Sequence, residues 1–233
     1  MLLERSFHIL RAQWRPPTLA RPRAFDEDTA LDAAMLRFWD HGYAATSVRD
    51  LGQAMGLGAA SLYNSFGDKH ALFARCLDRY LDGNMRERIA RLETMHPPRA
   101  AIEAFLQEVV ARSLCDRRGC LLVNTALEVA PHDAAVGAIV ADRLAELEGF
   151  FRRCVVAGQR AGSIARGRAA RDLARLLLTT VMGLRVLARA RPDPALLRGA
   201  ARQALALLDP PGASMPGRGA PRTRHRTATT GDA

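Results

Sequence analysis

Residues 46–72 constrain the fold more than any other segment, because two short helical patterns flank one glycine turn there. Val48, Leu51 and Met55 repeat at three- and four-residue spacing, which predicts one apolar face on a helix of about two turns. Gly56 is expected to end this helix, since glycine readily adopts the left-handed conformation that a sharp turn needs. The sequence therefore predicts a helix, a tight turn and a second helix in close succession.

The second helix is expected over about residues 58–65, and its polar side suits the major groove of DNA. Small residues and an amide can approach base edges closely; on this side lie Ala59, Ala60, Ser61 and Asn64. Tyr63 and Lys69, the only lysine of the chain, offer a hydroxyl and a cation to phosphate oxygens. Thr46 or Ser47 can cap the first helix, and both are also candidate DNA contacts. The segment is predicted to be a DNA-binding helix-turn-helix.

The region from about residue 21 to residue 80 resembles the DNA-binding domain of the TetR/AcrR family of bacterial transcription regulators. The family pattern is close to T-x-x-x-x-[IL]-A-x-x-x-G-[VL]-x-x-G-x-[LI]-Y-x-[HY]-F-x-x-K-x-x-L. The chain matches it at Thr46, Leu51, Gly56, Leu57, Leu62, Tyr63, Phe66, Lys69 and Leu72. It departs at Gly52, Ala60 and Ser65, where alanine, glycine, and histidine or tyrosine are usual.

The resemblance implies an all-α fold with an N-terminal three-helix DNA-binding domain and a C-terminal helical domain that binds an effector and forms a homodimer. It also implies a repressor that leaves a palindromic operator in double-stranded DNA when a small molecule or electrophile binds. The expected domains are an irregular extension over 1–20, the DNA-binding domain over 21–80, the helical domain over 81–209 and a disordered basic tail over 210–233.

Two arginines precede the first expected helix, which covers residues 28–41 and ends at Gly42. Arg21 and Arg23 lie in a short arm that can enter a minor groove, where the negative potential favours arginine. A further helix is expected to begin after Asp68, which can cap it.

Charge is distributed unevenly along the chain. Residues 1–24 contain five arginines against one glutamate, whereas residues 25–80 contain five Lys/Arg against eight Asp/Glu. The helix-turn-helix is therefore not a basic patch, and DNA binding there must depend on a few well-placed contacts. The acidic balance also leaves open a protein that acts through partner proteins and binds DNA weakly.

The C-terminal region has helical periodicity and no strand alternation. Helices are expected over 99–114, 120–129, 133–161, 169–190 and 194–208, with breaks at glycines and prolines. The resemblance implies that the last two helices pair with those of a second subunit. The apolar residues available for this are Leu173, Leu176, Leu177, Val181, Leu184, Leu187, Leu196, Leu205 and Leu208. Periodicity alone equally allows an ordinary monomer core.

A reactive cysteine is possible at the start of the helix expected over 120–129. Cys120, Asn124 and Glu128 stand at four-residue spacing, which places a thiol, an amide and a carboxylate on one helix face. A helix N-terminus and the adjacent Arg117 and Arg118 would both favour the thiolate. The stretch resembles the corresponding segment of NemR-like family members, in which the matching cysteine is the sensor. The alternative is a small residue that packs at a helix start.

Asn124 and Glu128 also have two interpretations. They can satisfy arginines or backbone groups nearby, or they can orient a small molecule in a mainly apolar cavity. The expected lining of that cavity adds Phe105, Leu127, Phe150, Leu178 and Met182.

Other functional classes find no support in the sequence. No apolar run approaches the ~18 residues of a membrane span, and the first residues lack a signal-peptide core. The four cysteines lack metal-ligand spacing, and no catalytic motif is present. We expect a cytoplasmic protein that is not an enzyme and needs no cofactor or metal.

Overall fold

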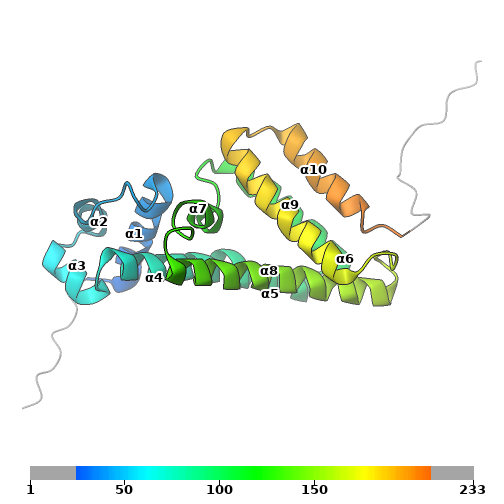
Figure 1. The fold of residues 1–233 in the computed structure, drawn as a ribbon, viewed down its shortest axis with the longest axis horizontal. Coiled ribbons are helices and arrows are strands. Elements are labelled where there is room, and N and C mark those ends of the chain that lie inside the picture. Colours follow the sequence, from blue (N-terminus) through cyan, green and yellow to red (C-terminus); the bar gives the residue numbers. More distant parts are fainter. Residues whose placement is uncertain (1–24, 211–233) are drawn as a thin grey trace, which may run out of the picture. The chain divides into compact units, whose positions relative to one another are not determined.

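The computed structural model of the chain describes residues 25–210. This part contains ten α-helices, one π-helical turn and no strand (Figure 1), which confirms the all-α class. It divides into two compact units after Tyr80. The arm with Arg21 and Arg23, the extension over 1–20 and nearly all of the basic tail lie outside the described residues.

The first unit consists of α1 (Glu27–His41), α2 (Val48–Met55), α3 (Ala59–Phe66) and α4 (Lys69–Leu81). Gly42 ends α1 with φ of 84°, and Gly56 ends α2 in the left-handed conformation with φ of 66°. Asp68 caps α4, because its Oδ1 accepts a hydrogen bond of 2.7 Å from the Ala71 N–H. The predicted stops and cap are thus confirmed.

The core of the first unit joins all four helices. Phe38 of α1 and Phe73 of α4 meet edge to face with their ring centroids 5.0 Å apart. Leu51 of α2, Leu62 of α3 and Leu72 of α4 are fully buried. The two short helices are therefore held by one apolar core.

The second unit begins with the π-helical turn η1 (Asp82–Arg86) and α5 (Glu87–Met95), which the sequence analysis did not predict. The remaining helices agree with the expected ranges to within two residues. They are α6 (Pro98–Cys115), α7 (Leu121–Glu128), α8 (Ala134–Ala161), α9 (Ala170–Ala190) and α10 (Pro194–Ala206).

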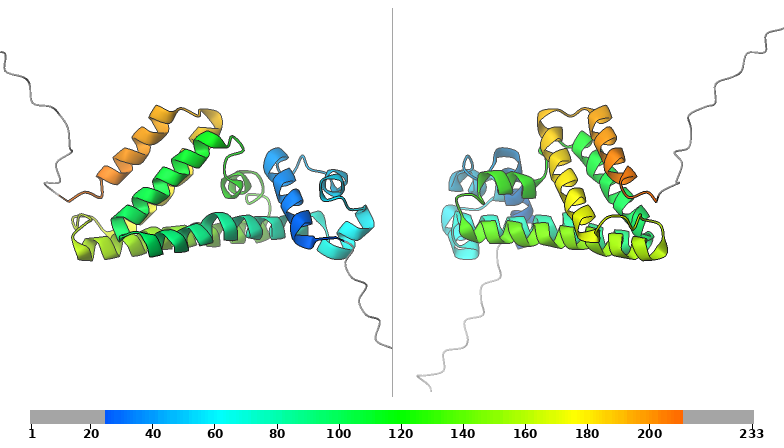
Figure 2. Two further views of the ribbon diagram at one scale, coloured as in Figure 1. Left: turned by 180° about the vertical axis from the view of Figure 1, so that it is seen from behind. Right: turned by 45° about the vertical axis from the view of Figure 1, so that its right-hand side comes forward.

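Three helices of the second unit, α6, α9 and α10, pack against one another, and α8 packs across α6 and α9 (Figure 2). Phe105, Phe150 and Phe151 are fully buried at this crossing, with ring centroids 5.2 to 5.4 Å apart. Within residues 25–210, no helix has both the length and the apolar character required to cross a membrane.

The turn between α2 and α3 requires a close approach of the backbone to Gly52. The Leu57 N–H donates a hydrogen bond of 2.9 Å to the Gly52 carbonyl oxygen. A Cβ at Gly52 would lie only 2.8 Å from the Leu57 carbonyl oxygen. Glycine here, where the family pattern has alanine, lets the turn lie close to α2.

We predict that Gly52→Ala lowers the free energy of unfolding by about 1–3 kcal/mol, because overpacking outweighs the better helix propensity of alanine. Denaturant unfolding followed by circular dichroism measures the change. Gly58→Ala is the matched control, since a Cβ there meets nothing within 4 Å and φ is −71°. Gly58→Ala should leave stability unchanged or raise it. A Gly52→Ala protein as stable as wild type would contradict the close approach.

Candidate functional site

Helix α3 has one buried and one exposed side. Leu62 and Phe66 are 0% and 4% exposed and fix the helix to the core. The residues predicted to approach base edges, Ala59, Ala60, Ser61 and Asn64, are all exposed. Tyr63, on the same helix, is exposed as well. No acidic or basic side chain lies on α3. The exposed side of α3 therefore offers hydrogen-bonding and small side chains without a charge of its own.

The start of α2 is fixed by Ser47 and Asp50. The Ser47 Oγ accepts a hydrogen bond of 3.1 Å from the Asp50 N–H, and the Asp50 Oδ2 accepts one of 2.9 Å from the Ser47 N–H. These two bonds form a capping box. The hydrogen bonds from the Ser47 side chain and backbone lower the pKa of Asp50. Ser47 is exposed and stays a candidate DNA contact.

Thr46 differs from the expectation. Its side chain is fully buried, and its hydroxyl donates a hydrogen bond of 2.7 Å to the Gly42 carbonyl oxygen. A side chain so placed supports the link between α1 and α2 and does not reach a ligand. We therefore withdraw Thr46 from the candidate DNA contacts.

Two cations flank the exposed side of the helix-turn-helix. The Nζ of Lys69 lies 4.3 Å from the centroid of the Tyr43 ring, so a cation–π contact helps to position the ammonium. Arg49, in the first turn of α2, is exposed, and no salt bridge involves it among the described residues. The sequence analysis missed Arg49, although its place just after a helix cap was a usable signal.

Three carboxylates of α1 form ion pairs with two arginines of α4. Arg79 of α4 binds Asp32 of α1 at 2.9 Å and Asp28 at 2.7 Å, and Arg75 binds Glu27. The hydrogen bond from Arg79 lowers the pKa of Asp32. These carboxylates therefore face cations of α4, and none of them belongs to α2 or α3.

The apolar residues predicted to line an effector cavity belong, with one exception, to the core of the second unit. Phe105 and Phe150 are fully buried and pack on each other, with ring centroids 5.4 Å apart. Leu127 of α7 is 67% exposed and does not belong to the core. Leu178 and Met182 are partly buried and pack against the core. Four of the five apolar residues thus lie in or against one core, and only Leu127 lies away from it.

Cys120 occupies the N-cap position of α7, one residue before the helix, and is half-buried. The Asn124 Nδ2 donates a hydrogen bond of 3.0 Å to the Arg118 carbonyl oxygen, so it holds the preceding loop. Arg118 itself binds Asp116 at 2.7 Å. Asn124 thus has the structural role that was one of its two interpretations, and Glu128 is half-buried at the end of α7.

The other cysteines differ in their surroundings. Burial raises the pKa of Cys76 to about 12 and that of Cys154 to about 11, so both are protonated thiols at neutral pH. Cys115 is exposed at the end of α6. The described residues contain no group of three or more His, Cys, Asp or Glu that could hold a metal ion.

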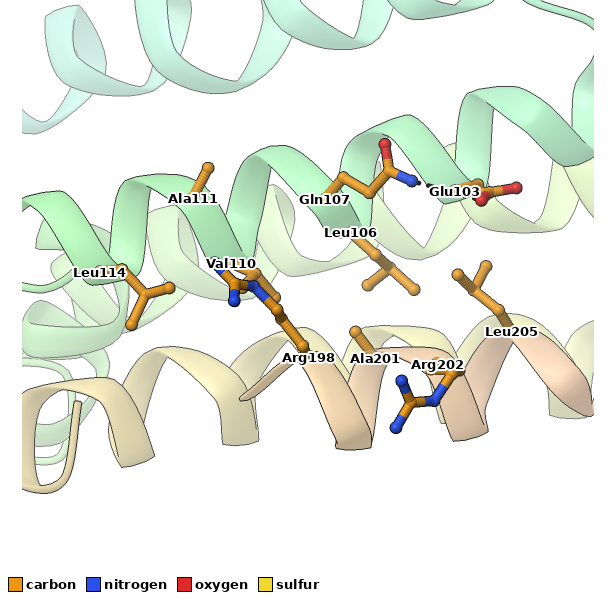
Figure 3. A pocket seen from close by; sticks show the side chains of 10 residues that line it. All are labelled: Glu103, Leu106, Gln107, Val110, Ala111, Leu114, Arg198, Ala201, Arg202 and Leu205. Atoms are coloured by element: carbon orange, nitrogen blue, oxygen red, sulfur yellow. Dashed lines mark hydrogen bonds between the residues drawn. The ribbon is translucent and has the colours of Figure 1, made fainter. Parts of the chain in front are cut away.

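A groove of about 400 Å³ lies between α6 and α10 (Figure 3). Its apolar part is lined by Leu106, Val110 and Leu205. From α10 project the side chains of Arg198 and Arg202. On α6, Gln107 donates a hydrogen bond of 3.3 Å to Glu103. The sequence did not predict this groove, because its walls are far apart along the chain.

A second groove, of about 380 Å³, lies on α9 and α10. We call it the α9–α10 groove; its residues are Leu176, Thr180, Gly183, Leu184, Leu187, Ala200, Gln203, Ala204 and Leu207. Most residues predicted for a dimer interface are instead core residues of one chain, namely Leu173, Leu177, Val181, Leu184 and Leu208. Leu176, Leu187 and Leu207 are 37%, 41% and 38% exposed and remain accessible to a partner.

Two family models match the chain. Residues 30–76 match bacterial regulatory proteins of the tetR family, and residues 98–204 match the tetracyclin repressor-like C-terminal domain. The HTH-type transcriptional repressor ComR of Escherichia coli (strain K12) is 31% identical over 172 residues, which cover 72% of this chain and 82% of ComR.

Solved structures show the same architecture. A cysteine variant of the TetR family transcriptional regulator CifR, complexed with 26-bp double-strand operator DNA, is 35% identical with a TM-score of 0.72. The match covers 81% of this chain and 99% of CifR. The reduced form of E. coli NemR has a TM-score of 0.71 over 79% of this chain and 98% of NemR, but is only 17% identical, so the likeness is one of fold.

Proposed function

The chain belongs to the TetR family of bacterial regulatory proteins, and we propose on this basis that it represses transcription from a palindromic operator and is released by an effector. It is a DNA-binding transcriptional regulator. The observation that carries the proposal is the exposed, uncharged side of α3, bordered by Arg49 and Lys69. Two relatives support it, since ComR is named a repressor and CifR was solved with operator DNA.

In the proposed DNA complex, α3 enters the major groove. Ser61 and Asn64 offer hydrogen bonds to base edges, and Ala59 allows the backbone to come close. Ser47, Tyr63, Arg49 and Lys69 contact phosphate oxygens and so fix the position of α3. Arg21 and Arg23 add minor-groove contacts.

The proposed repressor acts as a homodimer through the α9–α10 groove. Gly183 lies in the middle of α9, where glycine costs roughly 0.5–1 kcal/mol relative to alanine. A Cβ there would meet nothing within 4 Å in the single chain, so no contact within it explains the glycine. Close approach of a partner helix does explain it. Two subunits also match the two-fold symmetry of a palindromic operator.

Effector binding in the second unit lowers DNA affinity when the effector prefers the conformation that does not bind DNA. A tenfold loss of affinity needs only about 1.4 kcal/mol of differential binding. One proposed effector class is an electrophile that alkylates Cys120, since this thiol is half-buried at a helix start whereas Cys76 and Cys154 are buried. We further infer that the protein acts in the cytoplasm and is not an enzyme.

The alternative of a partner-protein regulator with weak DNA binding rested on the acidic balance of residues 25–80. The three carboxylates of α1 that face Arg75 and Arg79 leave this balance unchanged, because both arginines are already counted in it, but they lie on α1 and not on α2 or α3. Failure to bind any specific sequence selected from random DNA would favour this alternative.

We predict that base-contacting and phosphate-contacting residues affect DNA binding differently. Asn64→Ala should lower affinity for the selected operator by about 10- to 100-fold, as expected for ~1–3 kcal/mol from a base contact, and leave non-specific binding unchanged. Arg49→Ala should weaken binding to all sequences alike and reduce the salt slope by about 1. Fluorescence anisotropy at several salt concentrations measures both. Arg152→Ala, at an exposed position of α8, is the control. Identical behaviour of all three variants would contradict the proposed interface.

We predict that Leu187→Arg yields a folded monomer, since a charge would be buried in the α9–α10 groove of the dimer but exposed in one chain. Light scattering coupled to size-exclusion chromatography gives the mass, and circular dichroism checks the helix content. Leu127→Arg, at another exposed leucine, should remain dimeric. A Leu187→Arg dimer would place the interface elsewhere.

We predict that N-ethylmaleimide releases the wild-type protein from its operator and that Cys120→Ser abolishes this release while keeping operator affinity. The thiolate adds to the carbon–carbon double bond and the neighbouring carbon takes up a proton, so the adduct enlarges the half-buried position. Cys115→Ser is the control, because Cys115 is exposed outside the helix start. Release from Cys120→Ser at the wild-type rate would rule out Cys120 as the sensor.

A further inference from the structure

Arg88 of α5 is a buried cation with unused donors. The residue is only 8% exposed, and its Nε and Nη1 have no hydrogen-bond partner in the described part of the chain. Its guanidinium lies over the Phe105 ring, 4.1 Å from the centroid. Burial, together with the charges of Arg185 and Arg112, lowers the pKa of Arg88 to about 10, which still leaves it protonated at neutral pH.

A second buried arginine comes from α9. Arg185 is also 8% exposed, and its Nη1 donates a hydrogen bond of 3.2 Å to Oγ of Ser113 on α6. Helix α6 packs against both α5 and α9 (Figure 2), so the two arginines belong to neighbouring elements of one unit. We call Arg88 and Arg185 the arginine pair. Neither of them forms a salt bridge with any residue between 25 and 210.

The nearest carboxylates are bound to other arginines. Glu108 lies near enough to influence Arg88, but it accepts a hydrogen bond of 2.7 Å from Arg91. Asp116 is influenced by Arg185, but Arg118 binds it at 2.7 Å. The charge of the arginine pair is therefore not matched by a directly bonded carboxylate of the described chain.

Two buried guanidinium groups without an anion are unfavourable, because both lose hydration and repel each other. The planar guanidinium fork matches a carboxylate, which can accept two parallel hydrogen bonds. Phe105 and the adjoining Phe150 supply apolar surface beside the charge. A single negative charge is also less costly to bring into such surroundings than a phosphate dianion.

We propose that the arginine pair binds the carboxylate of a small organic acid with an apolar body, and that such an acid is an effector of the protein beside the proposed electrophile. The site itself stands on the buried arginines, whereas the effector role rests on the proposed function. The carboxylate completes the hydrogen bonding of Arg88 and separates the two like charges. The apolar body of the acid opens the packing beside Phe105, since this ring is fully buried without a ligand.

The binding test uses the full chain with benzoate and hexanoate, and with benzamide and hexanamide as uncharged counterparts. We expect calorimetric binding and a raised melting temperature with the acids only. Arg88→Met and Arg185→Met should each weaken acid binding at least tenfold. Arg86→Met, in η1, is the control, because Arg86 is exposed and paired with Asp82 and Glu146. Unchanged acid affinity in the folded Arg88→Met and Arg185→Met proteins would overturn the site.

A stability measurement separates a binding role from a structural one. Without ligand, Arg88→Met should melt at or above the wild-type temperature, since an unmatched buried charge is removed. If Arg88→Met does not fold, Arg88→Lys keeps the charge but loses the fork and should also bind the acids at least tenfold more weakly. Equal stabilisation by the amides, by chloride or by inorganic phosphate would contradict a carboxylate site.

Operator binding is measured separately, first without and then with the acids. Specific DNA binding without any acid binding overturns the inference and leaves the proposed function intact. Acid binding without DNA binding overturns the proposed function and leaves the site intact. Acid that binds through the arginine pair but does not weaken operator binding contradicts the effector role.

Discussion

Helix α3 is eight residues long, and a helix of this length is not stable in water by itself. Burial of Leu62 and Phe66 supplies most of the missing stability, at about 1.5–3 kcal/mol for each fully buried side chain. The turn before it is equally constrained, because Leu57 lies too close to Gly52 for any side chain. The exposed side of α3 is therefore positioned by residues that do not touch DNA, and changes in the core would alter recognition.

The arginines of the first unit differ in whether they pair with a carboxylate of the same unit. Arg75 and Arg79 bind carboxylates of α1, and Arg37 lies 3.4 Å from Asp50. In the proposed DNA complex, Arg49 and Lys69 are the main phosphate contacts beside α2 and α3. Few phosphate contacts per subunit give modest affinity, and pairing two subunits on one operator multiplies it. DNA affinity should therefore depend strongly on the proposed dimer.

The ends of most helices could be predicted from the sequence, whereas the burial and neighbours of side chains could not, and both outcomes have physical reasons. Gly42, Gly56 and Asp68 act locally, through backbone conformation or a cap, so their effect can be read along the chain. The continuation through η1 and α5 runs past Gly83, which does not end a helix there, and Pro97 is the first residue that marks its end. Burial depends on which distant helix covers a residue, and periodicity does not reveal this. Hence Leu176 and Leu177 looked equivalent in the sequence, although only Leu177 is fully buried.

The arginine pair gives the second unit a property that ordinary core residues lack. A core of apolar side chains is complete without a ligand, whereas unmatched buried charges leave the unliganded state with an unfavourable interaction that an anion relieves. The free energy released on binding is then available to bias the unit toward one conformation. By thermodynamic linkage, operator DNA must weaken acid binding by the same factor by which the acid weakens DNA binding. A modest acid affinity thus suffices to weaken operator binding, provided that the arginine pair interacts with the acid differently in the two conformations.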